Sequence, residues 1–422
     1  MKKVDKKLLA FCISVSLCAA ALSGCGTGSV ETNAEVQTTE EEQKVTKTDA
    51  IYIEPVANIS DDFIRGMDAS AVLVNENSGV KYYNYDGEEQ DVFQTLAEAG
   101  VNYIRLRVWN DPYDENGNEI NYGMSGENFL PSVLKLLEAG SRAVREIAEA
   151  NKRDIQIVVH YTNIEDNGQI DGLVSNLEKS GLDYDILGLS YYPFWDGNND
   201  NMQKVAKMIQ EKYGKKVVIA ETSYCYTSED GDGCENSLVG TDDLVDGYGA
   251  TVQSQATMIR DICAAANEAG VLGVFYWEGT WIPVGEETAD NSPIWEKYGS
   301  GWASSFASDY DPEDAGLYYG GCSWDNQAMF DFDGYPLESL KVFQYLKTGS
   351  DAPLAIDYIP EIAVSFSVGD KVELPEMIDV VYNNRAENKQ VADGMLTIGV
   401  RMKCNPKSWG TVDDFTLYKI SD

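Results

Sequence analysis

Short apolar runs alternate with longer amphipathic segments between about Phe63 and Leu346. The short runs are rich in Val, Ile and Leu and have the length of strands, whereas the longer segments repeat apolar residues every three or four positions, as helices do. Two helices are clearest, at Ser132–Lys152 and Gln255–Ala269, and Cys263 lies on the apolar face of the second, where we expect an inert core thiol. Six strands are expected, at Phe63–Asp68, Asn102–Trp109, Asp154–His160, Tyr184–Ser190, Lys216–Glu221 and Val271–Trp277.

This alternation predicts an α/β fold with a parallel sheet. Polar or aromatic residues stand where the expected strands end, namely Asp68, Trp109, His160, Tyr191, Glu221 and Trp277. In a (β/α)8 barrel, the carboxyl ends of the strands form the active-site face. The pattern therefore favours a TIM barrel with a site built from these strand ends.

Two carboxylates are candidates for chemistry. Hydrolysis of a glycosidic bond needs one group to protonate the leaving oxygen and, in retaining enzymes, a second to attack the anomeric carbon. Glu221 follows the apolar run Val217–Ala220, and an acid at the end of a buried strand is costly unless it has a partner or a function. Glu119 follows Asn118 in an acidic, loop-like stretch. The alternatives are a structural ion pair at Glu221 and an acidic turn at Glu119.

Seven segments together resemble glycoside hydrolase family 53, the arabinogalactan endo-β-1,4-galactanases. The resemblance covers roughly Ile51 to Thr348. It rests on Phe63–Ser70, Tyr103–Pro112, Ser190–Trp195, Ala220–Tyr224, Phe275–Pro283, Tyr298–Ser305 and Asp325–Asp331. It implies a retaining endo-hydrolase of β-1,4-galactan that needs no cofactor for its chemistry.

By this resemblance, Glu221 is the nucleophile and Glu119 the acid/base. Asn118 is expected to hydrogen-bond the sugar next to the cleavage point. Arg105 is expected to keep the nucleophile ionised, because a nearby guanidinium favours a charged carboxylate.

Three further residues are expected to bind substrate. Tyr191 is predicted to hydrogen-bond near the nucleophile, and Trp277 to form the floor of the subsite at the cleavage point. His160 stands at the tip of its strand, where a sugar contact and a purely structural role remain equally open. The 25 Tyr and 8 Trp fit a sugar-binding protein, although aromatic residues also fill cores.

The chain between Trp109 and Glu119 is shorter than the family pattern requires. Glu119 belongs after a fourth strand but comes ten residues after the second expected strand, and each βα unit needs roughly 30 residues. The sequence thus predicts a (β/α)8 TIM barrel lacking about two βα units, followed by short β-module fragments. Such a barrel has two open edges and exposed apolar surface. Three hypotheses follow: an active enzyme, a non-catalytic galactan-binding lipoprotein, or a chain that does not fold stably.

A metal site is also implied by the resemblance. Family members often bind calcium between two loops, here with Asp230, Asp232, Asn236 and Asp325 as candidate ligands. Cys234 and Cys322 stand where a His ligand and a Ser are expected, and a thiol is a poor calcium ligand. We therefore expect a disulfide between Cys234 and Cys322 to replace or reinforce the calcium that links the two loops. The alternative is that the four candidate ligands still bind calcium.

The amino terminus has the features of a bacterial lipoprotein signal. A basic start and the short apolar run Leu8–Leu22 precede the lipobox-like Leu22–Cys25, with Cys25 as the lipidation site; an ordinary secretory signal is the alternative. We expect an extracellular, cell-surface protein anchored in the membrane by lipid. The net charge of −38 argues against nucleic acid as a partner. The expected organisation is a signal peptide (1–25), a disordered tether (26–50), an incomplete galactanase barrel (51–350), a bacterial Ig-like fragment (351–393) and a carbohydrate-binding module fragment (394–422).

Overall fold

The fold is built on one parallel sheet of six strands. The computed structural model describes residues 51–107, 129–238, 240, 243–285, 290–299, 305, 319–320, 323–350, 352–360 and 377–391. The strand order is β2-β1-β6-β5-β4-β3, and all neighbouring pairs are parallel. The strands are β1 (Ile64–Asp68), β2 (Tyr103–Arg105), β3 (Val158–Tyr161), β4 (Ile186–Ser190), β5 (Lys216–Glu221) and β6 (Gly273–Tyr276). This sheet confirms the predicted α/β class.

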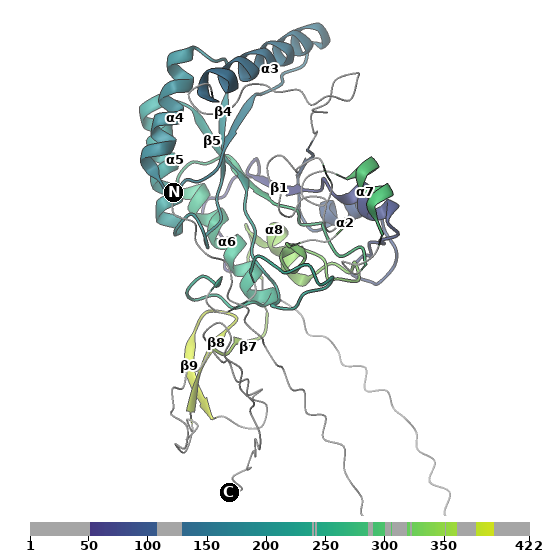
Figure 1. Ribbon diagram of the computed structural model, residues 1–422. Helices are drawn as coiled ribbons and strands as arrows, with labels where there is room; N and C mark the ends of the chain where they lie inside the picture. Colours follow the sequence, from purple (N-terminus) through teal and green to yellow (C-terminus); the bar gives the residue numbers. More distant parts are fainter. Residues whose placement is uncertain are drawn as a thin grey trace, which may run out of the picture. The chain divides into compact units, whose positions relative to one another are not determined.

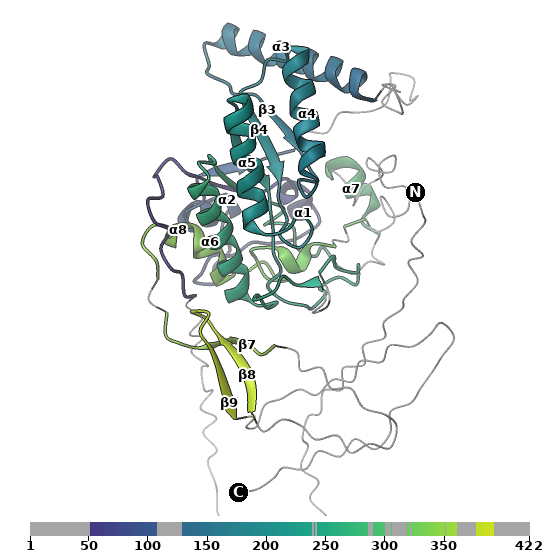
Figure 2. The same cartoon turned by 90° about the vertical axis from the view of Figure 1, so that its left-hand side faces the viewer.

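Helices connect the strands and pack beside one another along the sheet (Figures 1 and 2). Local chemistry sets their ends: the Asn198 side chain accepts a hydrogen bond from the backbone of Asn201 at the start of α5, and Gly214 ends this helix at a φ of 68°. The helices are α1 (Val72–Asn77), α2 (Val92–Glu98), α3 (Phe129–Asn151), α4 (Asn167–Ser180), α5 (Asn199–Tyr213), α6 (Val252–Glu268), α7 (Ser292–Tyr298) and α8 (Val342–Tyr345), with 3-10 turns at η5 (Asp325–Gln327) and η6 (Glu338–Lys341).

The core lies between the sheet and these helices. Val217 and Ile219 of β5 are buried, as are Ile259 and Ile262 of α6. Cys263 belongs to the same core, which confirms its predicted position, and burial raises the pKa of its thiol to about 12. Because the thiolate is the reactive form, this cysteine is inert at neutral pH.

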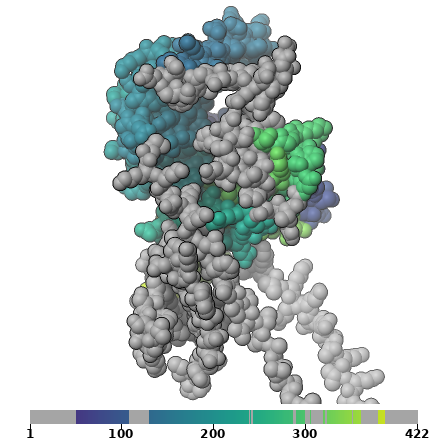
Figure 3. Space-filling view, viewed as in Figure 1, coloured from purple at the N-terminus to yellow at the C-terminus, as the bar shows by residue number. Residues whose placement is uncertain are grey.

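The described sheet ends at β2 and β3. Tyr103 of β2 is 52% exposed, Leu106 just after it is 62% exposed, and Val158 of β3 is 45% exposed. Beside β3, Leu137 of α3 and other apolar residues line an open cavity of about 190 Å³. The blue and teal residues of α3–α5 form one side of the described surface (Figure 3). Apolar side chains are thus exposed at both ends of the described sheet.

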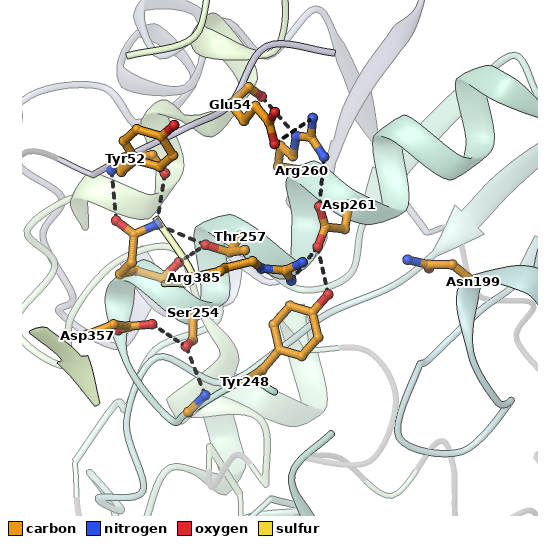
Figure 4. Close-up of polar contacts among 12 residues, drawn as sticks. Tyr52, Glu54, Asn199, Tyr248, Ser254, Thr257, Arg260, Asp261, Asp357 and Arg385 are labelled. Carbon is orange, nitrogen blue, oxygen red and sulfur yellow. Dashed lines mark hydrogen bonds and ion pairs between the residues drawn. The ribbon is translucent and has the colours of Figure 1, made fainter. Parts of the chain in front are cut away.

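A small sheet follows the main one, with strands β7 (Ile356–Tyr358), β8 (Met377–Tyr382) and β9 (Glu387–Val391) in this order. Asp357 of β7 accepts a hydrogen bond from Ser254 near the start of α6 (2.7 Å), and Arg385 pairs with Asp261 of α6 (2.5 Å; Figure 4). Arg385 also lies over the ring of Tyr248. These contacts tie the β7–β9 sheet to α6.

Among the described residues, none of the helices is both long and apolar enough to cross a bilayer. The predicted signal segment, tether and carbohydrate-binding module fragment lie outside the described residues. Their assignments therefore stay predictions.

Candidate active site

Glu221 stands at the carboxyl end of β5, and its side chain is 12% exposed. Arg105, at the end of β2, donates from Nη2 to Glu221 Oε1 (2.8 Å) and from Nη1 to Asp68 Oδ2 (2.5 Å). Asp68 is the last residue of β1 and is fully buried. One guanidinium thus bridges two carboxylates from two other strands, and the contact expected between Arg105 and Glu221 is present.

The second oxygen of Glu221 is bound by hydroxyl groups. Ser190, the last residue of β4, donates from Oγ to Glu221 Oε2 (2.8 Å), and Tyr192 lies 3.4 Å from the same oxygen through Oη. His160, on β3, places Nε2 2.9 Å from Ser190 Oγ. The carboxylate is therefore held at both oxygens, which fixes its plane.

Tyr191 contacts the nucleophile through its backbone, because its N–H donates to the carbonyl of Glu221 (2.9 Å). Its buried hydroxyl is turned away from the carboxylate and lies within hydrogen-bond distance of the carbonyl of Gly197 (3.0 Å) and of Asn199 Oδ1 (3.1 Å). The register between β4 and β5 shifts between Leu189 and Ser190, so strict alternation along the strand fails there. The hydroxyls of Ser190 and Tyr192, and not that of Tyr191, contact the carboxylate of Glu221.

Trp277 follows β6, and its backbone N–H donates to the carbonyl of Thr222, the residue after Glu221 (2.8 Å). The indole is largely buried, and its ring centroid lies 5.0 Å from the guanidinium carbon of Arg105 and 4.3 Å from that of Arg107. Arg107 forms an ion pair with the buried Glu278, and burial lowers the pKa of this arginine. Trp277 is thus next to the nucleophile, with guanidiniums close to its ring.

Four aromatic side chains extend the site beyond Glu221. Tyr192 contacts Phe194, Trp195 and Trp324 with ring centroids 5.4 to 5.7 Å apart. Trp195 is 56% exposed. Exposed aromatic rings offer flat apolar surfaces with polar edges, which suits the stacking of a pyranose ring.

The candidate metal ligands come together in the structure. Carboxylate oxygens of Asp230, Asp232 and Asp325 all lie within 4.8 Å of one another. Asp325 is fully buried, and its Oδ1 has no hydrogen-bond partner, nor does the buried Oδ1 of Asn236. Burial, with the nearby charge of Asp232, raises the pKa of Asp325 to about 7. Buried oxygens without donors around several carboxylates match the ligand preference of calcium.

Comparison with known proteins decides the family. The model of glycosyl hydrolase family 53 matches residues 64–128 and 115–343. The endo-β-1,4-galactanase of Bacillus subtilis is 38% identical over 392 residues, which cover 72% of this chain and 90% of that protein. The chain belongs to glycosyl hydrolase family 53.

The family 53 fold is also found by structure. The family 53 catalytic domain of Ignisphaera aggregans superposes with a TM-score of 0.54 at 29% identity, covering 70% of this chain and 99% of that one. An arabinogalactan endo-β-1,4-galactanase of Cellvibrio japonicus is 30% identical over 171 residues, 40% of this chain and 43% of that protein. The parallel sheet with its helices is therefore part of a TIM-like family 53 barrel.

Several predicted site residues of this family 53 chain lie outside the described residues. They are Asn118, Glu119, Cys322 and Cys25. The structure thus brings together Glu221, Arg105, Trp277 and, through Ser190, His160. Sequence reasoning missed Ser190, Tyr192 and Asp68 as partners of this group, although Asp68 and Ser190 are polar residues at the ends of expected strands.

Proposed function

We propose that this chain hydrolyses β-1,4-galactosidic bonds inside galactan or arabinogalactan by double displacement, with retention of configuration. The observation that supports this most is Glu221, an acid at the carboxyl end of a barrel strand held by Arg105, Ser190 and Tyr192. The relatives from Bacillus subtilis and Cellvibrio japonicus carry galactanase names. Polymeric galactan is the proposed partner, and the chemistry needs no cofactor.

In the first step, a Glu221 carboxylate oxygen attacks the anomeric carbon while Glu119 gives its proton to the leaving oxygen. In the second step, Glu119 removes a proton from water, and the hydroxide releases the sugar from Glu221. Arg105 stabilises the carboxylate before attack and after release. Asn118, Trp277 and His160 are the proposed substrate-binding residues.

The test is release of reducing ends from linear β-1,4-galactan. We expect release by the wild-type protein, loss of at least about 1000-fold in Glu221→Gln, and no change in Glu211→Gln, whose side chain is exposed on α5. Equal rates in Glu221→Gln and the wild type would reject Glu221 as the nucleophile.

A second candidate is a non-catalytic galactan-binding lipoprotein, because we also propose that the third and fourth βα units are missing. The sheet described here ends at β2 and β3. The Bacillus subtilis alignment spans 392 residues, although 72% of the 422 residues here is only about 304, a difference of about 88. The family model matches in two overlapping pieces. The end of the sheet and the overlap of the two matches at residues 115–128 support a lost block between β2 and α3, and the alignment supports a loss without giving its position.

The two candidate functions differ in turnover. Galactan binding by isothermal titration without release of reducing ends would favour the binding protein, whereas release favours the enzyme. A broad thermal transition would point instead to a chain that does not fold stably, because a packed barrel melts cooperatively.

Calcium is proposed at Asp230, Asp232, Asn236 and Asp325. We expect the melting temperature to rise on addition of calcium and to fall with a chelator, because a ligand that binds only the folded state stabilises it. The replacement Asp325→Ala removes a buried ligand and should abolish this response. An equal response in the variant would contradict the assignment.

A disulfide between Cys234 and Cys322 remains a proposal for the same loops. Cys234 lies beside the carboxylate cluster, where its backbone N–H donates to Asp232 Oδ1 (2.8 Å). Intact mass after alkylation, with and without reductant, tests the bond. Two thiols alkylated at these positions without reductant would exclude it.

The chain is further proposed to be exported and anchored at the bacterial cell surface through a lipid on Cys25. The domain limits given from the sequence belong to this proposal. Metabolic labelling with a fatty acid tests it, with Cys25→Ser as the control: label retained by the variant would contradict a lipid at this position.

A further inference from the structure

A polar chain runs across three neighbouring strands to the carboxylate of Glu221. His160 lies on β3, Ser190 on β4 and Glu221 on β5. The two links are His160 Nε2 to Ser190 Oγ (2.9 Å) and Ser190 Oγ to Glu221 Oε2 (2.8 Å). The shift of register after Leu189 brings Ser190 opposite Glu221. This arrangement depends on the sheet itself, not on a mobile loop.

The direction of the hydrogen bonds follows from counting protons. An ionised carboxylate only accepts hydrogen bonds, so Ser190 must use its one hydroxyl proton toward Glu221. The hydroxyl oxygen can then only accept from His160, whose Nε2 must carry the hydrogen. His160 Nε2–H therefore donates to Ser190, and Ser190 donates to Glu221.

We propose that His160 is a positioning residue that acts on Glu221 through Ser190, beside any contact it makes with sugar. The inference rests on the proposed role of Glu221 as the nucleophile.

Charged groups surround the His160–Ser190 pair. Glu221 is also faced by Arg105 of β2, which Asp68 of β1 holds, and by Tyr192 after β4. Burial of the ring lowers the pKa of His160, the charge of Glu221 opposes this shift, and the charge of Arg105 adds to it. A neutral ring at neutral pH suits an Nε2–H donor.

The consequence for catalysis is geometric. Arg105 binds one oxygen of Glu221, and Ser190, which accepts a hydrogen bond from His160, binds the other. The carboxylate therefore presents one orientation to the anomeric carbon. When the glycosyl–enzyme ester breaks, the carboxylate regains its charge, and the two donors stabilise it again. Loss of the His160–Ser190 pair should thus lower kcat more than it changes KM.

The first test measures the tautomer of His160 directly and does not depend on enzymatic activity. The signal is unambiguous because His160 is the one histidine of the chain. Nitrogen-15 NMR of histidine-labelled protein at pH 8 reports the tautomer of this ring alone. We expect the Nε2–H tautomer, and a spectrum of the Nδ1–H tautomer would overturn the inference. In Ser190→Ala the acceptor is gone, so the tautomer should shift toward a mixture.

The second test is a double-mutant cycle on galactan hydrolysis. Ser190→Ala should lower kcat on the order of 10- to 100-fold, as expected for loss of a hydrogen bond to a charged group, and His160→Ala should lower it less. In the Ser190→Ala background, His160→Ala should have little further effect on kcat. Full additivity of the two losses would overturn the proposal and leave His160 as a sugar contact.

Two controls separate a local effect from a failure of folding or of the proposed function. Ser180→Ala removes a serine at the end of α4, whose Oγ donates to the carbonyl of Leu177, and should keep full activity. Each variant should also give a melting curve that coincides with that of the wild type. If the wild type does not hydrolyse galactan but shows the Nε2–H tautomer, the hydrogen-bonded chain stands and the proposed function fails.

Discussion

Removing the Arg105 side chain should destabilise the protein strongly. In Arg105→Met, the carboxylates of Asp68 (0% exposed side chain) and Glu221 (12%) lose their shared cation. Breaking a buried ion pair costs about 3–5 kcal/mol, because a charge is left without a partner. For a domain of this size, that loss lowers the melting temperature by roughly 6–20 °C. Urea unfolding and thermal melting at pH 7 measure both quantities.

A double replacement tests the cause. Asp68→Asn together with Arg105→Met removes one of the stranded charges, so part of the lost stability should return. Arg145→Met is the matched control, since Arg145 pairs with Asp183 and Asp185 at the surface and its loss should matter much less. A loss below about 1 kcal/mol in Arg105→Met would refute the bridging role derived from the contacts.

Three further predictions concern stability and self-association. Burial raises the pKa of Asp196 to about 6, helped by Glu165, so the folded state binds a proton more tightly than the unfolded chain and stability falls as pH rises from about 4 to 6. Asp196→Asn should therefore be about 1–2 kcal/mol more stable than the wild type at pH 7.5 and no more stable near pH 4, by urea unfolding; equal gains at both pH values would contradict this. Arg107→Met leaves Glu278 buried without its cation and should cost about 3 kcal/mol, whereas unchanged urea midpoints would speak against the ion pair. Val158→Lys, on the exposed edge strand β3, should reduce self-association in light scattering at an unchanged melting temperature, because a charge blocks edge pairing.

The sequence pattern located every strand of the main sheet but not all of their limits. Lys216–Glu221 matches β5, because a central strand is paired on both sides along its apolar run. By contrast, the strand expected at Asp154–His160 is observed as β3 at Val158–Tyr161. Among the described residues this strand pairs with β4 alone, and its ladder begins where Val158 meets Ile186. Which strand lies at the edge of a sheet depends on tertiary structure, and the pattern of apolar residues along the chain does not indicate it.

Only part of the site could be predicted from the sequence, because some of its contacts also depend on how the strands pair. Glu221 was located from the sequence as an acid after an apolar strand, and Arg105 from the resemblance to the family. Ser190 and Tyr192 were not, because they depend on a shift of register that no residue pattern marks. The contact of Asp68 with Arg105 links the first two strands, and only the folded sheet brings these residues together.

Covalent trapping tests the central claim most directly. A 2-deoxy-2-fluoro-β-galactobioside with a good leaving group slows hydrolysis of the glycosyl–enzyme ester, so the labelled peptide can be found by mass spectrometry. The account predicts one added fluoro-galactobiosyl group on Glu221 and none in Glu221→Gln. A label on another carboxylate, or an equal label in the variant, would contradict it.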